Sequence, residues 1–394
     1  MGKLSFKKLL TLLLLVRFVG VVASASSTEE GNALLKWKPS FENQTKSQLT
    51  SWTLVSPNAT SSTPLTTPCS WPGISCNLAG SVTKINLTSF GFKWYIIDNL
   101  SKLIYLDLSF NHFSGKIPPE ISLLTNLQNL HLDENQLNGT ITSEIGQCPS
   151  LNELALYGNS LDGQISTSLG NLSNLVKLYL HNNLLSSSIP IEMGSLTNLI
   201  ELYLNTNHLT GLIPSSFGNF TKLTMLHALD NQLSGPILEE LGNLKCLEHL
   251  SLYSNNLSGS ILVSLGGLTN LTYFHLYGNQ LSSLIPKELG NLKSLTDLKL
   301  SVNQLNGSPP PSFGNLINLE ILYLHQNQLS RSIPQEMTNL MKLSILQLDT
   351  NQFTGPLPNI CQGGSLVYFT ASNNNLIGNI PKGLKLHKLG KSPS

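Results

Sequence analysis

The chain has 394 residues, of which 11% are charged and 40% hydrophobic, and its formal net charge at pH 7 is +1. This balance excludes the strongly basic surface that a nucleic-acid-binding protein needs. With only five cysteines, the composition suits a neutral, secreted scaffold.

Residues 1–25 have the pattern of a secretory signal peptide. Lysines between Lys3 and Lys8 precede an apolar run over residues 9–22, and the small residues Ala23-Ser24-Ala25 follow. This order of basic, apolar and small segments is typical of a cleaved leader. No other segment has the 18 or more continuous apolar residues that a membrane span needs. We therefore expect a secreted, extracellular chain with no membrane span.

Residues 26–80 precede the repeats and are predicted to form an N-terminal cap. Ala33, Leu34 and Trp37 have the spacing of an amphipathic helix. Cys69 and Cys76 lie seven positions apart at the start of the repeats, and in a secreted protein such a pair favours a disulfide. The alternative, half of a metal site, lacks nearby cysteine or histidine ligands.

Residues 81–384 form an internal repeat. An asparagine recurs every 24 residues from Asn111 to Asn351, and again at Asn374 after 23. Around it stands the template L-x-x-L-x-L-x-x-N-x-L-x-G-x-I-P, which is typical of a leucine-rich repeat. The alternating leucines predict a short strand with one buried face, and the asparagine amide can bond the backbone of adjacent rungs. We expect an α/β repeat solenoid of about 13 stacked rungs. Residues 385–394 leave the pattern and form an irregular tail.

Three cysteines lie outside the cap. Cys148 takes a place that is leucine in other rungs, Cys246 a place that is asparagine or serine, and Cys361 lies in a late rung. A structural or incidental role is expected for each of them.

The cap and the repeats together carry a resemblance to a known family. The segment A-L-L-x-W-K from Ala33, P-C-S-W-P-G-I-S-C from Pro68 and the 24-residue units resemble the ectodomain of plant leucine-rich-repeat receptor-like kinases. The resemblance implies a right-handed, curved superhelix in the apoplast that binds a secreted peptide or protein and pairs with a co-receptor kinase ectodomain. Full-length relatives lie in the plasma membrane and carry a Ser/Thr kinase domain. That domain is absent from this sequence, so we expect a truncated receptor or a gene fragment.

The candidate ligand-binding residues lie six, four and two positions before the ladder asparagines, where side chains alternate with the buried leucines. Exposed tyrosine gives a large contact area with a polar tip, which suits recognition. The preference of tyrosine for strands could explain its frequency at these positions, but histidine has no strong preference of this kind. Imidazoles titrate near pH 6.5, so binding is expected to depend on pH between about 5 and 7. The candidates on this concave face are Tyr157, Tyr179, His181, Tyr203, His227, His249, Tyr253, Tyr273, His275, Tyr277, Tyr323 and His325.

No N-glycosylation sequon falls at the candidate face positions from Tyr157 to Tyr323. Seven strand steps of about 4.8 Å span roughly 34 Å, the length of an extended peptide of about ten residues. Some sequons arise by chance in an asparagine-rich repeat. The ten candidates are Asn43, Asn58, Asn86, Asn99, Asn138, Asn171, Asn219, Asn256, Asn270 and Asn306.

Three classes of function were compared. An extracellular, ligand-binding receptor ectodomain of plant signalling or defence fits best. The alternative is a secreted cell-wall enzyme inhibitor of the polygalacturonase-inhibitor type, which also has about ten such repeats. An enzyme is not expected, because no kinase glycine loop and no Ser/His/Asp signature occurs. Neither a cofactor nor a metal is expected, because metal-binding histidines would have to converge at about 2 Å from one ion.

Overall fold

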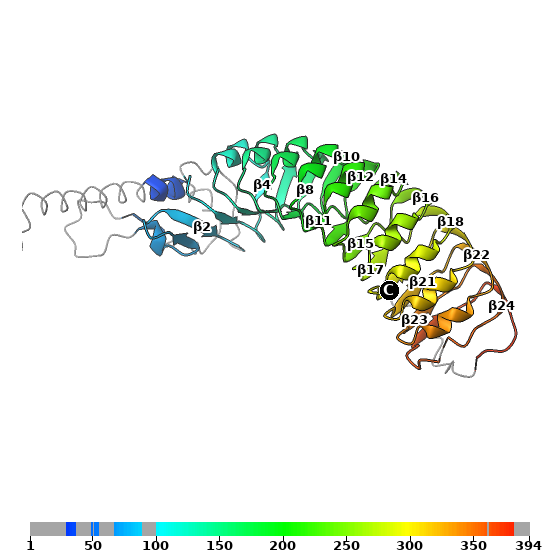
Figure 1. Ribbon diagram of the computed structural model, residues 1–394. Helices are drawn as coiled ribbons and strands as arrows, with labels where there is room; N and C mark the ends of the chain where they lie inside the picture. Colours follow the sequence, from blue (N-terminus) through cyan, green and yellow to red (C-terminus); the bar gives the residue numbers. More distant parts are fainter. Residues whose placement is uncertain are drawn as a thin grey trace, which may run out of the picture. The chain divides into compact units, whose positions relative to one another are not determined.

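The computed structural model describes residues 29–36, 49, 51–54, 67–88, 100–360 and 362–381. Their contacts form two compact units that meet in sequence between Leu175 and Val176. Figure 1 shows the described helices and strands coloured along the chain. The predicted signal peptide, Cys361 and the tail 385–394 lie outside the described residues.

The first unit begins with the predicted cap. A helix covers residues 29–36, and β1 (Ile74–Cys76) pairs antiparallel with β2 (Val82–Asn86) after the 3-10 turn η2 (Pro68–Ser70). The Cys69–Cys76 disulfide is present, with an S–S distance of 2.03 Å and a Cα–Cα distance of 5.5 Å. Inside the cap the buried rings of Trp52 and Trp71 stack with centroids 5.1 Å apart. The carboxylate of Glu30 accepts the Val82 N–H at 2.8 Å, so the helix is tied to the first rung.

Each rung contributes one short strand to a parallel sheet, which we call the inner sheet. Within each unit these strands pair without a register shift, so equivalent positions of successive rungs lie side by side. Four strands in the first unit and nine in the second give, among the described residues, the 13 rungs predicted from the repeats. They are β2, β3 (Tyr105–Asp107), β5 (Asn129–His131) and β7 (Glu153–Ala155), then β9 (Lys177–Tyr179), β11 (Glu201–Tyr203), β13 (Met225–His227), β15 (His249–Ser251), β17 (Tyr273–His275), β19 (Asp297–Lys299), β21 (Ile321–Tyr323), β23 (Ile345–Gln347) and β25 (Tyr368–Thr370).

A second set of short parallel strands follows the ladder asparagines and forms an outer sheet. The repeat pattern predicted a return path here but not a sheet, because strands of two to five residues exist only through pairing with their neighbours. They are β4 (Ser114–Gly115), β6 (Gln136–Gly139) and β8 (Ser160–Gln164), then β10 (Leu184–Ser188), β12 (His208–Gly211), β14 (Gln232–Pro236), β16 (Asn256–Ser260), β18 (Gln280–Leu284), β20 (Gln304–Gly307), β22 (Gln328–Arg331), β24 (Gln352–Pro356) and β26 (Asn375–Ile377).

In ten of the rungs the helical part is a 3-10 helix of five residues. Ten such helices follow the outer strands in the described part of the repeats. They are η3 (Pro119–Leu123), η4 (Ser143–Gln147), η5 (Thr167–Asn171), η6 (Ile191–Ser195), η7 (Ser215–Asn219), η8 (Glu239–Asn243), η9 (Val263–Gly267), η10 (Lys287–Asn291), η11 (Pro311–Asn315) and η12 (Gln335–Asn339).

The core lies between the inner sheet, the outer sheet and the 3-10 helices. Leu199, Leu202 and Leu204, which are the template leucines of one rung, are fully buried. Cys148 is also buried, as expected of a residue that replaces leucine, whereas Cys246 is exposed. Burial places the Cys148 thiol in the core, out of contact with solvent.

The ladder asparagines make the predicted hydrogen bonds. The side-chain amide of Asn207 donates to the carbonyl of Leu180 in the preceding rung at 3.1 Å and to two carbonyls of its own rung at 3.1 and 3.2 Å. Its Oδ1 accepts the N–H of Leu185 at 3.0 Å. Asn135 in the first unit makes the same set. Asn207 and Asn135 therefore each join their rung to the one before.

Replacing Asn207 by alanine should destabilise the second unit. The change leaves buried backbone carbonyls without a donor, and each such group costs about 1 to 3 kcal/mol. We expect a loss of about 3 kcal/mol in the free energy of unfolding, measured by urea denaturation. Gln280→Ala, which removes an exposed amide from β18, is the control. A loss for Asn207→Ala no larger than that of the control would contradict the role of the ladder.

Candidate recognition surface

The inner sheet of the second unit presents one face to solvent. In β11, Leu202 points into the core while Glu201 and Tyr203 on either side remain partly exposed. The other candidates from Tyr179 to His325 also stand at face positions and are half-buried, except for Tyr273, which is 40% exposed. Tyr157 occupies the same kind of position in the first unit. All twelve candidates therefore lie where the repeat pattern predicted.

Nine of these side chains form a continuous series of ring contacts, which we call the ring ladder. Aromatic pairs at such separations contribute about 0.5 to 1.5 kcal/mol each, so the contacts favour one arrangement of the rings. Ring centroids are 5.2 Å apart for Tyr179 and Tyr203, 5.6 Å for His181 and Tyr203, 4.5 Å for Tyr203 and His227, 6.3 Å for His227 and His249, 4.4 Å for His249 and Tyr273, 6.2 Å for Tyr273 and His275, 6.3 Å for His275 and Tyr277, and 4.2 Å for Tyr277 and Tyr253.

A charged group on β19 links the ring ladder to Tyr323 and His325. The Asp297 carboxylate lies 3.1 Å from His275 Nε2 and 3.0 Å from Lys299 Nζ. The same ammonium lies 5.2 Å from the ring centroid of Tyr323, whose ring is 5.7 Å from that of His325. Burial alone would raise the pKa of Asp297, but hydrogen bonding and the charges of His275 and Lys299 lower it. Asp297 and Lys299 are thus both charged, and their opposite charges largely cancel.

The imidazoles of the face do not titrate as the sequence led us to expect. Burial lowers the pKa of His181, His249 and His325, and it lowers that of His227 to about 4, with neighbouring histidines adding to the effect. His227 is therefore largely neutral between pH 5 and 7, and the other three protonate at a lower pH than a solvated imidazole. The unperturbed pKa applies only to a solvated ring, and the pH dependence of binding stays a prediction.

Two side chains that contact the ring ladder, Glu201 and Met225, are not among the twelve candidates. The Tyr179 hydroxyl donates to the Glu201 carboxylate at 2.5 Å, and the Tyr203 hydroxyl lies 3.0 Å from Met225 Sδ. Both partners occupy the column six residues before the ladder asparagine. Their shared repeat position could have identified these two residues, but the candidates included only tyrosines and histidines.

The face of the first unit is built differently. His131 lies between two carboxylates, 3.9 Å from Asp107 and 3.3 Å from Glu153, and the Tyr105 hydroxyl donates to Asp107 at 3.0 Å. Burial alone would lower the pKa of His131, but the two carboxylates outweigh it and raise the pKa to about 9. His131 is consequently a cation at neutral pH, and its contacts with Asp107 and Glu153 connect β5 to β3 and β7.

The candidate glycosylation sites divide into two groups. Asn138, Asn171, Asn219, Asn256, Asn270 and Asn306 are exposed, and Asn86 is partly exposed. Asn43, Asn58 and Asn99 lie outside the described residues. Within the second unit, no sequon falls among the face positions, in agreement with the prediction.

The described residues contain no cluster of three or more potential metal ligands. A search of the same part of the chain for membrane-spanning helices found none of sufficient length and apolar character.

Comparison with protein families supports the repeat architecture directly. The family model described as leucine rich repeat N-terminal domain matches residues 27–77. Leucine rich repeat models match residues 102–124, 126–148, 174–196, 198–220, 246–268, 270–292 and 294–353. The chain is a leucine-rich-repeat protein.

Relatives of this leucine-rich-repeat protein are receptor kinases and their ectodomains. MDIS1-interacting receptor like kinase 2 of Arabidopsis thaliana is 46% identical over 102 residues, which make up 25% of this chain and 9% of that kinase. The plant peptide hormone receptor RGFR1, solved in complex with RGF2, is 39% identical with a TM-score of 0.77, over 80% of this chain and 54% of that one. Arabidopsis HAESA, solved with the peptide hormone IDA and the co-receptor SERK1, is 29% identical with a TM-score of 0.68, over 90% and 67%. The chain thus spans about half of the RGFR1 chain.

The ion pairs of His131 should make the first unit's stability depend on pH in a defined direction. Because the folded pKa of about 9 exceeds the unfolded value of 6.5, the stabilisation is complete below pH 6.5 and is lost as pH rises through about 9. We expect His131→Ala to lower the free energy of unfolding by about 2 kcal/mol at pH 6, after allowance for solvent screening.

The same substitution should have much less effect at pH 9.5, and urea denaturation at both pH values measures the difference. His112→Ala, at an exposed position of the same unit, is the control. An effect of His131→Ala that is equal at the two pH values would show that the charge of His131 contributes nothing.

Proposed function

We propose that this chain is an extracellular recognition domain that binds an extended peptide along the inner face of its second unit. The observation that carries the proposal is the ring ladder, whose contacts run unbroken from Tyr179 to Tyr277. From β9 to β21 there are six strand steps, about 29 Å, which an extended peptide of about nine residues would cover. Tyr157 belongs to the first unit, and its part in binding stays a prediction.

The chemistry of the face favours hydrogen bonding over charge. Phenol hydroxyls and neutral imidazoles each donate and accept, so they match the alternating N–H and C=O groups of a peptide backbone. Asp297 and Lys299 largely neutralise each other. The ligand segment that crosses the ring ladder is therefore uncharged in this proposal.

The similarities support a peptide as the class of ligand. The titles of the RGFR1 and HAESA structures name complexes with peptide hormones, and the HAESA title names a co-receptor. By extension, a co-receptor kinase ectodomain is a second partner of this chain. Residues 1–25 support secretion into the apoplast. The similarity to receptor kinases lies in the repeats, so it assigns no kinase activity to this chain.

Removing two rings of the face should abolish tight binding. A peptide selected from a random twelve-residue library against the secreted protein would be titrated against Tyr203→Ala combined with Tyr253→Ala. Buried aromatic anchors contribute about 2 kcal/mol or more each, so we expect at least about a hundredfold loss of affinity.

The matched control for this experiment is Gln232→Ala combined with Gln280→Ala, two exposed outer-sheet positions of the same unit. If the selected peptides bind the tyrosine double variant as tightly as the unmodified protein, the recognition surface lies elsewhere.

Binding of an uncharged peptide should vary little with pH. Because the pKa of His227 is lowered to about 4 and burial also lowers the pKa of three further histidines, the face gains less charge between pH 7 and pH 5 than four solvated imidazoles would. We expect the dissociation constant to change by less than about threefold, by isothermal titration calorimetry at the two pH values. A tenfold change would mean that imidazole protonation is part of recognition.

A further inference from the structure

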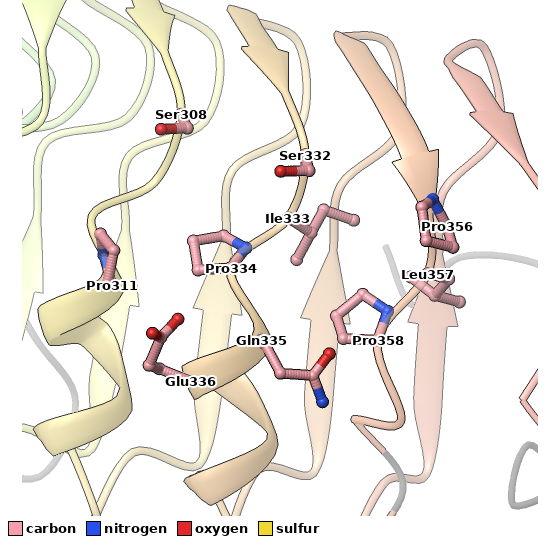
Figure 2. Close-up of a pocket in the computed structure, with 10 residues that line it drawn as sticks. All are labelled: Ser308, Pro311, Ser332, Ile333, Pro334, Gln335, Glu336, Pro356, Leu357 and Pro358. Carbon is pink, nitrogen blue, oxygen red and sulfur yellow. The ribbon is translucent and has the colours of Figure 1, made fainter.

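The second unit has a groove away from the inner face. Its volume is about 520 Å³, within the range of ligand pockets, and it lies where outer strands lead into the helices η11 and η12. Figure 2 shows Pro334 and Pro358 at a similar level on neighbouring rungs and the Glu336 carboxylate between Pro311 and Pro334. Ser308 and Ser332 stand above them.

Small side chains open this groove. At the repeat position of Ser308 and Ser332, Leu284 stands one rung earlier and its side chain covers Gly307, where an added Cβ would meet Leu284 Cδ2 at 2.3 Å. Over Gly355 the corresponding residue is Ser332, whose Cβ would be 3.6 Å away. Two serines in succession therefore leave empty the space that leucine fills in the preceding rung.

One residue that lines the groove, Ser308, also belongs to a glycosylation sequon. Asn306, Gly307 and Ser308 form the motif, Asn306 is exposed near the end of β20, and Ser308 lines the groove. Asn306 and the groove residue Ser308 are two positions apart, which is about 7 Å in extended backbone. A sugar linked to Asn306 would thus start beside this groove.

The lining suits a neutral, hydroxyl-rich ligand. Proline rings offer apolar surfaces without N–H donors, which complement the C–H faces of sugar rings. Ser332, Gln335 and Glu336 supply hydrogen-bonding groups for sugar hydroxyls. Glu336 carries the one formal charge among the lining residues, so an anionic ligand is disfavoured. We propose that Asn306 carries an N-linked glycan whose first sugars occupy this groove against Pro334 and Pro358.

The chain contains a matched comparison site. Asn138 stands at the same repeat position as Asn306, three residues after its ladder asparagine, and is followed by Gly139 with the same positive φ. The positions equivalent to Pro311 and Pro334 are Ser143 and Ser166. A glycan at Asn138 therefore has the same attachment without the proline surface.

The test uses the full chain secreted from eukaryotic cells that add N-glycans. Glycopeptide mass spectrometry measures occupancy, and release by peptide N-glycosidase is followed under native conditions. If about nine in ten molecules hold the glycan in the groove, release from Asn306 is about tenfold slower than from Asn138. An unoccupied Asn306, or equal release rates at the two sites, overturns the proposal.

Two variants separate the groove from other causes of slow release. Ser332→Leu fills the groove with the side chain that Leu284 and Leu212 carry at the same repeat position, and Pro334→Ser copies the equivalent Ser166. Either change should bring release from Asn306 to the rate at Asn138, while the thermal unfolding curve shows that the protein is folded. Slow release that persists in both folded variants also overturns the proposal, and would point to the outer strands rather than the groove.

Discussion

The hydrogen bonds of the ladder asparagines are the interaction on which the described repeats depend. Each buried amide satisfies carbonyls of two successive rungs and also accepts an N–H from the start of the outer strand. The same bonds recur from rung to rung, for example at Asn135, Asn207 and Asn231, and they hold the inner strands in one register. Register in turn aligns the side chains of equivalent positions into columns. The proposed recognition surface depends on that alignment, because rings from separate rungs meet only when the strands keep their register.

The contrast between His131 and His227 illustrates how neighbours decide the chemistry of one repeat position. Both stand four residues before a ladder asparagine, and both are largely buried. His131 meets two carboxylates, so it is held as a cation with a pKa of about 9. His227 meets other rings and histidines, so burial prevails and its pKa falls to about 4. The same residue thus serves as an electrostatic clamp in one unit and as a neutral contact in the other.

The inner face and the outer side of the second unit carry different kinds of residues. The inner face carries closely packed rings and leaves no sequon among its exposed columns. The outer side carries exposed sequons and the proline-lined groove. This division is physically consistent, because a bulky glycan on the inner face would cover the rings, whereas on the outer side it meets only the return path of each rung. The residue at the repeat position of Leu284, Ser308 and Ser332 decides whether the outer surface is filled, as by leucine, or forms a groove, as beside the two serines.

The sequence by itself determined the repeat, the cap and the columns of the inner face. A strict 24-residue period leaves one way to bury the leucines, and strand alternation then places residues such as Tyr203 and His275 on the exposed side. The Cys69–Cys76 bond and the buried Cys148 followed from the same reasoning. The tertiary structure decided what depends on distances between rungs. The ion pairs of His131, the pairing of the outer strands and ring contacts such as that of Tyr203 with His227 all join residues more than 20 positions apart. A one-dimensional pattern records which residues share a column, but not which neighbour each side chain touches.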